Sequence, residues 1–131
     1  LYKKIKSINK SINVFEANYK PLNLSKFNRK KKYFMFCGIG NPHEFKNTLL
    51  KYNFKVQKEI IYPDHYDFSI NEIKTIKKIA KKENLNIITT EKDFNRLSKN
   101  QKKEIQFLKV KLNIKNSKKL KKIIFKINEK N

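Results

Sequence analysis

Residues 33–42 read YFMFCGIGNP, in which an apolar run passes directly into a turn that contains two glycines. Five apolar residues in a row match the length of a strand that is buried on both faces. After the turn, Asn41 is suited to cap a helix, Pro42 is suited to its first position, and apolar residues follow at helical spacing. This segment therefore predicts a buried strand that leads into a helix.

The order of strand, loop and helix recurs twice further along the chain. A second strand is predicted over residues 54–62, and Ser69 and Glu72 then form a capping box ahead of an amphipathic helix. A third, short strand is predicted over residues 85–88, and residues 89–93 lead from it into another helix.

The two ends of the chain carry the remaining predicted elements. Residues 1–11 have helical spacing and are interpreted as the end of a preceding element, and residues 12–19 approximate the alternation of an edge strand. Residues 105–114 alternate as one final strand, and residues 115–131 are predicted to form a lysine-rich C-terminal helix. We expect a single domain over residues 1–131.

Alternating strands and helices with short loops predict an α/β fold, in which a small, mostly parallel sheet is flanked by helices. In such sheets the functional loops gather at the carboxyl ends of the strands. If the three central strands run the same way, residues 38–41, 63–66 and 89–93 lie on one rim of the sheet.

The formal net charge is +22, from 33 lysine and arginine residues against 11 aspartates and glutamates. Such an excess is typical of proteins that bind nucleic acid or an anionic membrane. Only Arg29 and Arg96 carry the forked guanidinium that favours specific phosphate and base recognition, and the lysines are spread along the whole chain. We therefore expect no specific nucleic-acid partner, and attraction to an anionic membrane surface stays open.

Gly38 and Gly40 are the only glycines, whereas a Walker A phosphate loop requires the pattern Gly-x-x-x-x-Gly-Lys-Ser/Thr. Cys37 has no disulfide partner, and two histidines with one cysteine provide no zinc constellation. No apolar run reaches the ~18 to 20 residues that cross a bilayer. The sequence therefore predicts neither a nucleotide loop, nor a metal site, nor a membrane span.

Residues 63–66 read Pro-Asp-His-Tyr and form the most chemically suggestive segment. A histidine beside Asp64 and close to Asp67 can move a proton or orient a carboxylate near neutral pH. The alternative for His65 is an ordinary hydrogen-bonded loop residue. His43 is expected to be a surface residue in a first helical turn.

Two further loops leave a structural and a chemical interpretation open. The first loop contains Gly38, Gly40 and Asn41. It either forms a tight turn that requires positive φ or presents its backbone to a ligand at a helix start. The second loop contains Thr90, Glu91, Lys92 and Asp93. It either caps a helix and forms a local ion pair, or it forms part of a functional site.

Three motifs occur in order along the chain: FCGIGNP at residues 36–42, YPDHYDF at residues 62–68, and TTEKD at residues 89–93 with Leu97 after it. Together they resemble the C-terminal signature of the lipid A 4'-kinase (tetraacyldisaccharide 4'-kinase) family. The resemblance implies a P-loop-like kinase of two α/β parts. The nucleotide loop is then in the N-terminal part, and the active-site cleft lies between the two parts.

The resemblance also implies an activity, in which the γ-phosphoryl group of ATP is transferred with Mg²⁺ to the 4'-hydroxyl of a tetraacylated glucosamine disaccharide 1-phosphate. The family's Asp-His motif matches Asp64 and His65, and its histidine assists an aspartate of the N-terminal part that takes the proton from the substrate hydroxyl. His65 and Asp64 are therefore the expected catalytic residues. The expected substrate or cleft loops contain Gly38, Gly40, Asn41, Thr90, Glu91, Lys92 and Asp93.

The chain begins at Leu1 in a lysine-rich stretch, and we expect a C-terminal fragment of a larger kinase that is inactive alone and binds neither ATP nor Mg²⁺ by itself. Its expected partners are the missing N-terminal P-loop half, the lipid A disaccharide precursor and the inner-membrane surface. The expected location is the cytoplasm, peripheral to the cytoplasmic face of the bacterial inner membrane. The alternative function is a small, lysine-rich, non-catalytic protein that binds RNA or an anionic membrane.

Overall fold

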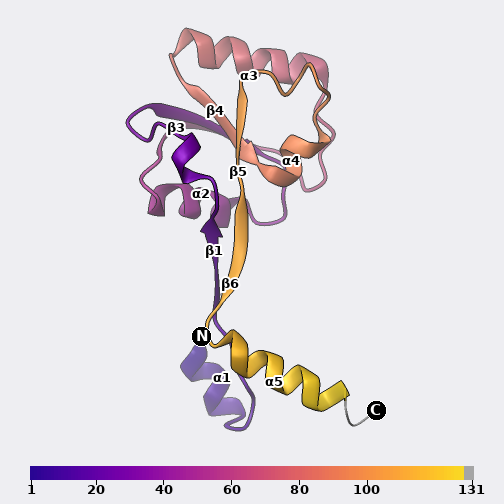
Figure 1. Ribbon diagram of the computed structural model, residues 1–131. Helices are drawn as coiled ribbons and strands as arrows, with labels where there is room; N and C mark the ends of the chain where they lie inside the picture. The colour runs from indigo at the N-terminus through magenta and orange to yellow at the C-terminus, as the bar shows by residue number, and fades with distance from the viewer. Residues whose placement is uncertain (129–131) are drawn as a thin grey trace. The chain divides into compact units, whose positions relative to one another are not determined.

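Four parallel strands form the sheet of the larger of two units into which the computed structural model divides, Pro21–Val110 (Figure 1). In their spatial order the strands are β3 (Lys55–Ile61), β2 (Lys32–Cys37), β4 (Asn86–Thr90) and β5 (Ile105–Leu108). The structure describes residues 1–128. The predicted α/β fold with a small, mostly parallel sheet is confirmed.

Helices cover both faces of this sheet, and the side chains of β2 alternate between them. Tyr33, Met35 and Cys37 belong to the core cluster that includes the buried residues of α2 (Pro42–Lys51). Phe34 and Phe36 belong to the cluster that includes the buried residues of α3 (Ile70–Lys82). All five side chains are 0% exposed, which explains why this strand is apolar throughout instead of alternating.

The order of the strands creates a switch point between β2 and β4. From β2 the chain passes through α2 to β3 on one side, and then through α3 to β4 on the other side of β2. From β4 it continues through the short helix α4 (Glu91–Arg96) to β5. Ligands of open α/β sheets bind at the carboxyl ends of strands beside such a switch point. The loops after β2 and β4 therefore flank the place where this topology favours a site.

The helices of the larger unit begin at the residues that the sequence predicts. The Asn41 side chain caps α2, the Ser69 side chain and Glu72 make both bonds of the capping box of α3, and Thr90 caps α4. These bonds satisfy backbone N–H groups that have no partner inside the helix. Each cap also defines where a rim loop ends.

Two of the predicted strands differ from the structure. The strand expected over residues 12–19 is instead β1 (Ala17–Pro21), and four of its five residues are exposed, so no buried face enforces an alternating pattern. The strand expected over residues 105–114 is interrupted at Lys109. It forms β5 and β6 (Val110–Ile114), because β5 joins the four-stranded sheet and β6 pairs with β1 in a separate two-stranded sheet.

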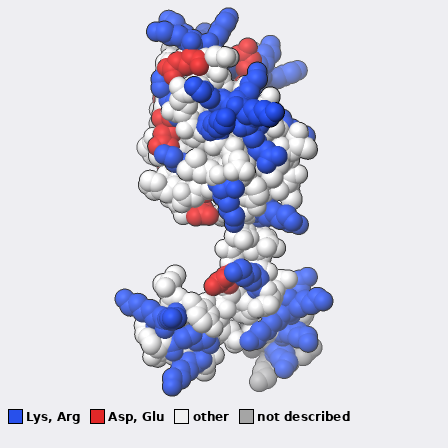
Figure 2. Space-filling view, turned by 90° about the vertical axis from the view of Figure 1, so that its left-hand side faces the viewer, with Lys and Arg blue, Asp and Glu red and all other residues white. Residues whose placement is uncertain are grey.

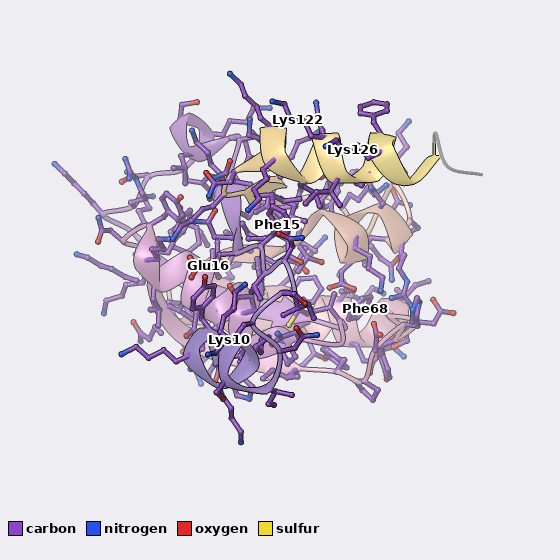
Figure 3. All side chains as sticks on the ribbon, turned by 90° about the horizontal axis from the view of Figure 1, so that it is seen from below. Lys10, Phe15, Glu16, Phe68, Lys122 and Lys126 are labelled. Atoms are coloured by element: carbon purple, nitrogen blue, oxygen red, sulfur yellow. The ribbon has the colours of Figure 1, made fainter. Side chains whose placement is uncertain are left out.

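The smaller unit consists of Leu1–Lys20 and the chain from Lys111 onward. It contains α1 (Tyr2–Ile8) and α5 (Ser117–Asn128), the helix on which Lys122 and Lys126 are labelled in Figure 3. Both terminal helices were predicted, although residues 129–131 of the second prediction lie outside the described residues. The prediction of a single domain over residues 1–131 stays a prediction.

Among the described helices, none is both long enough and apolar enough to span a membrane. A short 3-10 helix, η1 (Leu24–Lys26), lies between β1 and β2.

The two faces of α3 provide a test of the core assignment. Ile76 is 1% exposed. Ile76→Ala is expected to lower the free energy of unfolding by about 2–5 kcal/mol, because the smaller side chain leaves a cavity under the sheet. Ile70 on the same helix is 62% exposed, and Ile70→Ala is expected to change the free energy by less than about 0.5 kcal/mol. Urea denaturation measures both values, and equal losses would contradict this burial.

Candidate functional site

The loops after β2, β3 and β4 meet at the carboxyl edge of the sheet. The Gly38 N–H donates to Asp93 Oδ2 at 3.0 Å, and the Gly38 carbonyl accepts from the His65 N–H at 3.2 Å. Lys92 Nζ lies 3.1 Å from Asp64 Oδ1. The three predicted rim loops are therefore in direct contact, as expected for strands that run the same way.

The two glycines are explained by close approach and not by backbone conformation. Neither Gly38 nor Gly40 has positive φ, so the first of the two interpretations, a tight turn that requires positive φ, is wrong. A Cβ atom on Gly38 would lie 3.0 Å from the Pro63 carbonyl oxygen and 3.1 Å from Tyr66 Cβ. A Cβ atom on Gly40 would lie 3.3 Å from the Asp64 carboxylate. The glycines therefore let the 63–66 loop pack directly onto the end of β2.

The left-handed backbone conformation in these rim loops belongs to His65, whose φ is 60°. This region is unfavourable for residues other than glycine and persists where the surroundings hold it. The His65 N–H donates to the Gly38 carbonyl and also to Asp64 Oδ1, at 2.9 Å. These bonds hold the turn, while the His65 side chain is 74% exposed. The imidazole is thus fixed at its base and accessible at its ring.

Asp64, His65 and Lys92 form a charged group at the rim. Lys92 Nζ lies 3.5 Å from His65 Nε2, and Asp64 Oδ2 lies 3.8 Å from the same ring nitrogen. The hydrogen bond from Lys92 is the main cause that lowers the pKa of Asp64, so the carboxylate form is favoured beyond its ordinary range. The imidazole therefore lies beside a fixed carboxylate and an ammonium group, which suits proton transfer or the orientation of a partner carboxylate.

Asp93, the residue after Lys92, is 0% exposed. Besides the Gly38 N–H, its Oδ2 atom accepts a hydrogen bond from the Thr90 hydroxyl at 2.8 Å. Its Oδ1 atom lies 3.6 Å from Arg96 Nη1. The sequence correctly predicts Asp93 as a capping partner of Thr90, whose hydroxyl accepts the Asp93 N–H, but it contains no local signal for this burial.

The structure does not bring every predicted site residue into contact with His65. The Glu91 carboxylate lies 3.3 Å from Lys109 Nζ in an ion pair at the sheet edge, and Asn41 Oδ1 accepts the Glu44 N–H in the cap of α2. Asp67, expected close to His65, is exposed and forms no hydrogen bond or ion pair with His65 in the described structure. His43 is exposed in the first turn of α2, as predicted.

Tyr66 belongs to the segment over residues 63–66 that the sequence singles out, but the sequence pattern assigns it no role. Its hydroxyl donates to Glu72 Oε1 at 2.5 Å, and its ring stacks on Tyr62 with a centroid distance of 4.6 Å. The hydrogen bond to the Glu72 carboxylate raises the pKa of Tyr66 and lowers that of Glu72. Glu72 was recognised only as a member of the capping box, and no sequence pattern indicates its second bond.

The described residues show little that would hold a metal or act as a nucleophile. Within residues 1–128 no three His, Cys, Asp or Glu side chains come together as metal ligands. Cys37 is buried, and this burial raises the pKa of its thiol to about 12. The thiol therefore stays protonated and serves as a small apolar side chain.

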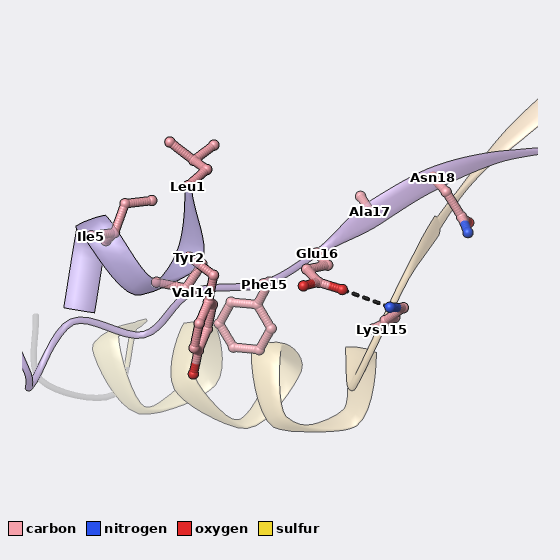
Figure 4. Close-up of a pocket in the computed structure, with 9 residues that line it drawn as sticks. All are labelled: Leu1, Tyr2, Ile5, Val14, Phe15, Glu16, Ala17, Asn18 and Lys115. Carbon is pink, nitrogen blue, oxygen red and sulfur yellow. Dashed lines mark hydrogen bonds and ion pairs between the residues drawn. The ribbon is translucent and has the colours of Figure 1, made fainter. Parts of the chain in front are cut away.

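A hollow of about 450 Å³ lies in the smaller unit (Figure 4). Its walls are mainly apolar side chains of α1 and of residues 14–18. Its polar contribution is the ion pair of Glu16 and Lys115, in which the hydrogen bond from Lys115 lowers the pKa of Glu16. This hollow contains none of the residues that the three motifs supply.

The origin of the Asp64 pKa can be tested by removing its partner amine. Lys92→Met is expected to raise the Asp64 pKa towards the ordinary value of about 3.9, because the hydrogen bond from Lys92 is the main cause of its lowering. Since the folded-state pKa is depressed, the pair stabilises the fold above about pH 3.9, and this contribution is lost as the pH falls through the folded-state pKa.

Carboxyl ¹³C NMR titration of wild type and variant measures this pKa. Lys46→Met is the matched control, because Lys46 pairs with Glu59 at 2.9 Å and is expected to leave the Asp64 titration unchanged. An identical Asp64 pKa in wild type and Lys92→Met would refute the assigned cause.

Comparison with proteins of known sequence identifies relatives that match most of the chain. This chain is 42% identical to the tetraacyldisaccharide 4'-kinase of Pelagibacter ubique over 127 residues, and the match covers 97% of this chain and 40% of that protein. The kinase of the same name from Rickettsia akari is 38% identical over 116 residues, which are 86% of this chain and 34% of that protein.

A crystal structure of LpxK from Aquifex aeolicus, described as an "apo" form in complex with ATP, has a similar fold. The TM-score is 0.51 at 22% identity, over 93% of this chain and 40% of that one. The chain therefore spans 34–40% of the length of these relatives. The model of the family described as Tetraacyldisaccharide-1-P 4'-kinase matches residues 2–129, and this chain accordingly belongs to that family.

Proposed function

We propose that this chain forms the C-terminal part of a lipid A 4'-kinase. The enzyme transfers the γ-phosphoryl group of ATP to the 4'-hydroxyl of a tetraacylated glucosamine disaccharide 1-phosphate. The observation that carries the proposal is the meeting of the three family motifs at one rim, where the His65 imidazole is exposed beside Asp64 and Lys92. The names of the relatives support the reaction. The match covers only 40% of the Pelagibacter ubique kinase, which supports the assignment of ATP binding to another part of the enzyme.

His65 is proposed to assist an aspartate of the N-terminal part, which takes the proton from the substrate hydroxyl. Phosphoryl transfer requires the attacking hydroxyl to be oriented by such a residue. An imidazole beside that aspartate holds the carboxylate in position and exchanges protons with it. The 74% exposure of the His65 side chain supports this role, because the ring is open to a group from another part of the enzyme.

ATP and Mg²⁺ are assigned to the N-terminal P-loop half of the proposed enzyme. Both glycines of this chain lie in the turn after β2, so no Walker A loop can be formed from it. The described residues contain no cluster of potential metal ligands either. We therefore assign none of the described residues a contact with ATP or Mg²⁺ in the proposed mechanism. We propose that the chain alone is inactive.

We propose that the enzyme acts as a peripheral protein at the cytoplasmic face of the bacterial inner membrane, and its proposed lipid substrate supports a membrane surface as the place of reaction. In Figure 2 lysine and arginine side chains lie on the surface of each of the two units, and acidic side chains are fewer. A basic residue near an anionic surface contributes about 1 kcal/mol of attraction. The family membership does not favour the alternative of a non-catalytic RNA-binding or membrane-binding protein, and we propose no specific nucleic-acid partner.

The electrostatic contribution to membrane attraction can be measured with lipid vesicles. The chain is expected to bind vesicles that contain anionic lipid and not to bind vesicles of neutral lipid. In 0.5 M salt, where the Debye length is about 4 Å, binding is expected to fall at least about tenfold. Co-sedimentation at several salt concentrations provides the measurement. Binding that is insensitive to salt would show that the lysines do not provide the attraction.

The proposed activity can be tested in a chimaera in which residues 1–131 replace the matching segment of the Pelagibacter ubique kinase. This chimaera is expected to phosphorylate the lipid A precursor with ATP. His65→Ala is expected to lower kcat by about 10²-fold, because the partner carboxylate loses its imidazole. His43→Ala, which changes the only other histidine, serves as the control and is expected to retain the wild-type rate.

A folded chimaera without kinase activity would contradict the proposed function. Unchanged turnover in the His65→Ala form would remove His65 from the mechanism while leaving the kinase assignment in place.

A further inference from the structure

The backbone of Gly38 connects Asp93 to His65 by two hydrogen bonds. Its N–H donates to the Asp93 carboxylate at 3.0 Å, and its carbonyl accepts from the His65 N–H at 3.2 Å. Gly38 and Asp93 are separated by 55 positions in the sequence. This connection therefore passes through all three family motifs, with one residue from each.

Capping of α4 does not account for the position of the Asp93 carboxylate. The cap consists of the Thr90 hydroxyl and the Asp93 backbone N–H, which are 3.1 Å apart. Asp93 Oδ2 accepts from the Thr90 hydroxyl and also from the Gly38 N–H, which lies outside the helix, and the side chain is 0% exposed. An exposed aspartate at this position would cap the helix as well, so the burial needs a separate cause.

The burial of Asp93 is unfavourable unless its charge is paired and hydrogen-bonded. Its Oδ2 atom receives the bonds from Gly38 and Thr90, and Oδ1 is close to Arg96 Nη1. Oδ1 and Arg96 Nη1 each lack a hydrogen-bond partner among the described residues. Such an incompletely satisfied arrangement is a weak source of stability, so stability alone does not explain why the carboxylate is buried against the Gly38 N–H.

We propose that Asp93 is a positioning residue of the kinase site. Its buried carboxylate holds the turn at Gly38, and Gly38 in turn holds the left-handed backbone that presents the His65 imidazole. The effect on catalysis rests on the proposed kinase function, because Asp93 would act on the reaction only through His65. The anchoring itself is a property of this chain and can be observed without turnover.

The anchoring can be tested by NMR spectroscopy of the 131-residue chain. In Asp93→Ala the Gly38 N–H loses its acceptor, so the amide proton resonances of Gly38 and His65 are expected to shift and the Gly38 resonance to move upfield. In Asp93→Asn the side-chain oxygen can still accept from Gly38, so smaller shifts are expected. Ile76→Ala serves as a control, because it lowers stability without removing a contact of Gly38 and is expected to leave both resonances in place.

The catalytic consequence can be tested in the chimaera with the Pelagibacter ubique kinase. Asp93→Ala is expected to lower kcat by about 10²-fold with little change in KM, since it displaces the group that assists the chemistry and not the substrate. Asp93→Asn is expected to restore most of the rate. The Ile76→Ala form, assayed below its unfolding temperature, is expected to retain the wild-type kcat.

Unchanged Gly38 and His65 resonances in Asp93→Ala would overturn the inference, and so would an Asp93→Asn form as slow as Asp93→Ala. If Asp93→Ala does not fold, Asp93→Asn decides: a retained Gly38 hydrogen bond with near wild-type kcat supports the inference, and loss of either one overturns it. An inactive wild-type chimaera would instead reject the proposed kinase function, while the resonances would still report on the anchoring.

Discussion

The carboxyl edge of the sheet depends on the absence of a side chain at Gly38. The Pro63 carbonyl oxygen and Tyr66 Cβ occupy the space into which a Cβ atom would extend, at 3.0 and 3.1 Å. Only this close approach allows the Gly38 carbonyl to accept the His65 N–H while its N–H reaches Asp93. A larger residue would push the loop after β3 away from the end of β2, and the imidazole would lose its support. The constraint is one of space and not of backbone angle, because Gly38 has no positive φ.

The buried sheet provides the frame that makes this contact possible. All side chains from Tyr33 to Cys37 are fully buried, so β2 is held from both faces and its end has little freedom to move. Parallel pairing of β2 with β3 and with β4 then brings the loops that follow these strands to the same edge. The strand order adds the switch point between β2 and β4, at which Gly38 and Asp93 meet. Packing thus positions the loops, and polar contacts between them position His65.

The resulting rim has the character of one half of a site. It offers an exposed imidazole, an ionised carboxylate and an ammonium group on a firmly packed base, and its described residues contain neither a phosphate loop nor a metal cluster. Such a surface can orient and assist a reacting group that another part of the protein supplies. This division agrees with the family relatives, of which the chain spans 34–40%. In the proposed kinase, the N-terminal part is expected to supply the nucleotide and the reacting carboxylate to this rim.

Local patterns predicted the helices, their caps and the central strands, because these features depend on residues that are at most four positions apart. The Asn41, Ser69 and Thr90 caps and the apolar run over residues 33–37 belong to this class. Tertiary structure decided the contacts that span long separations, such as 28 positions from Asp64 to Lys92 and 55 from Gly38 to Asp93. It also divided the last predicted strand at Lys109, since two different sheets provide the pairing partners. Sequence spacing contains no information on which distant groups share a buried space, and that space is created only when the sheet and its helices pack.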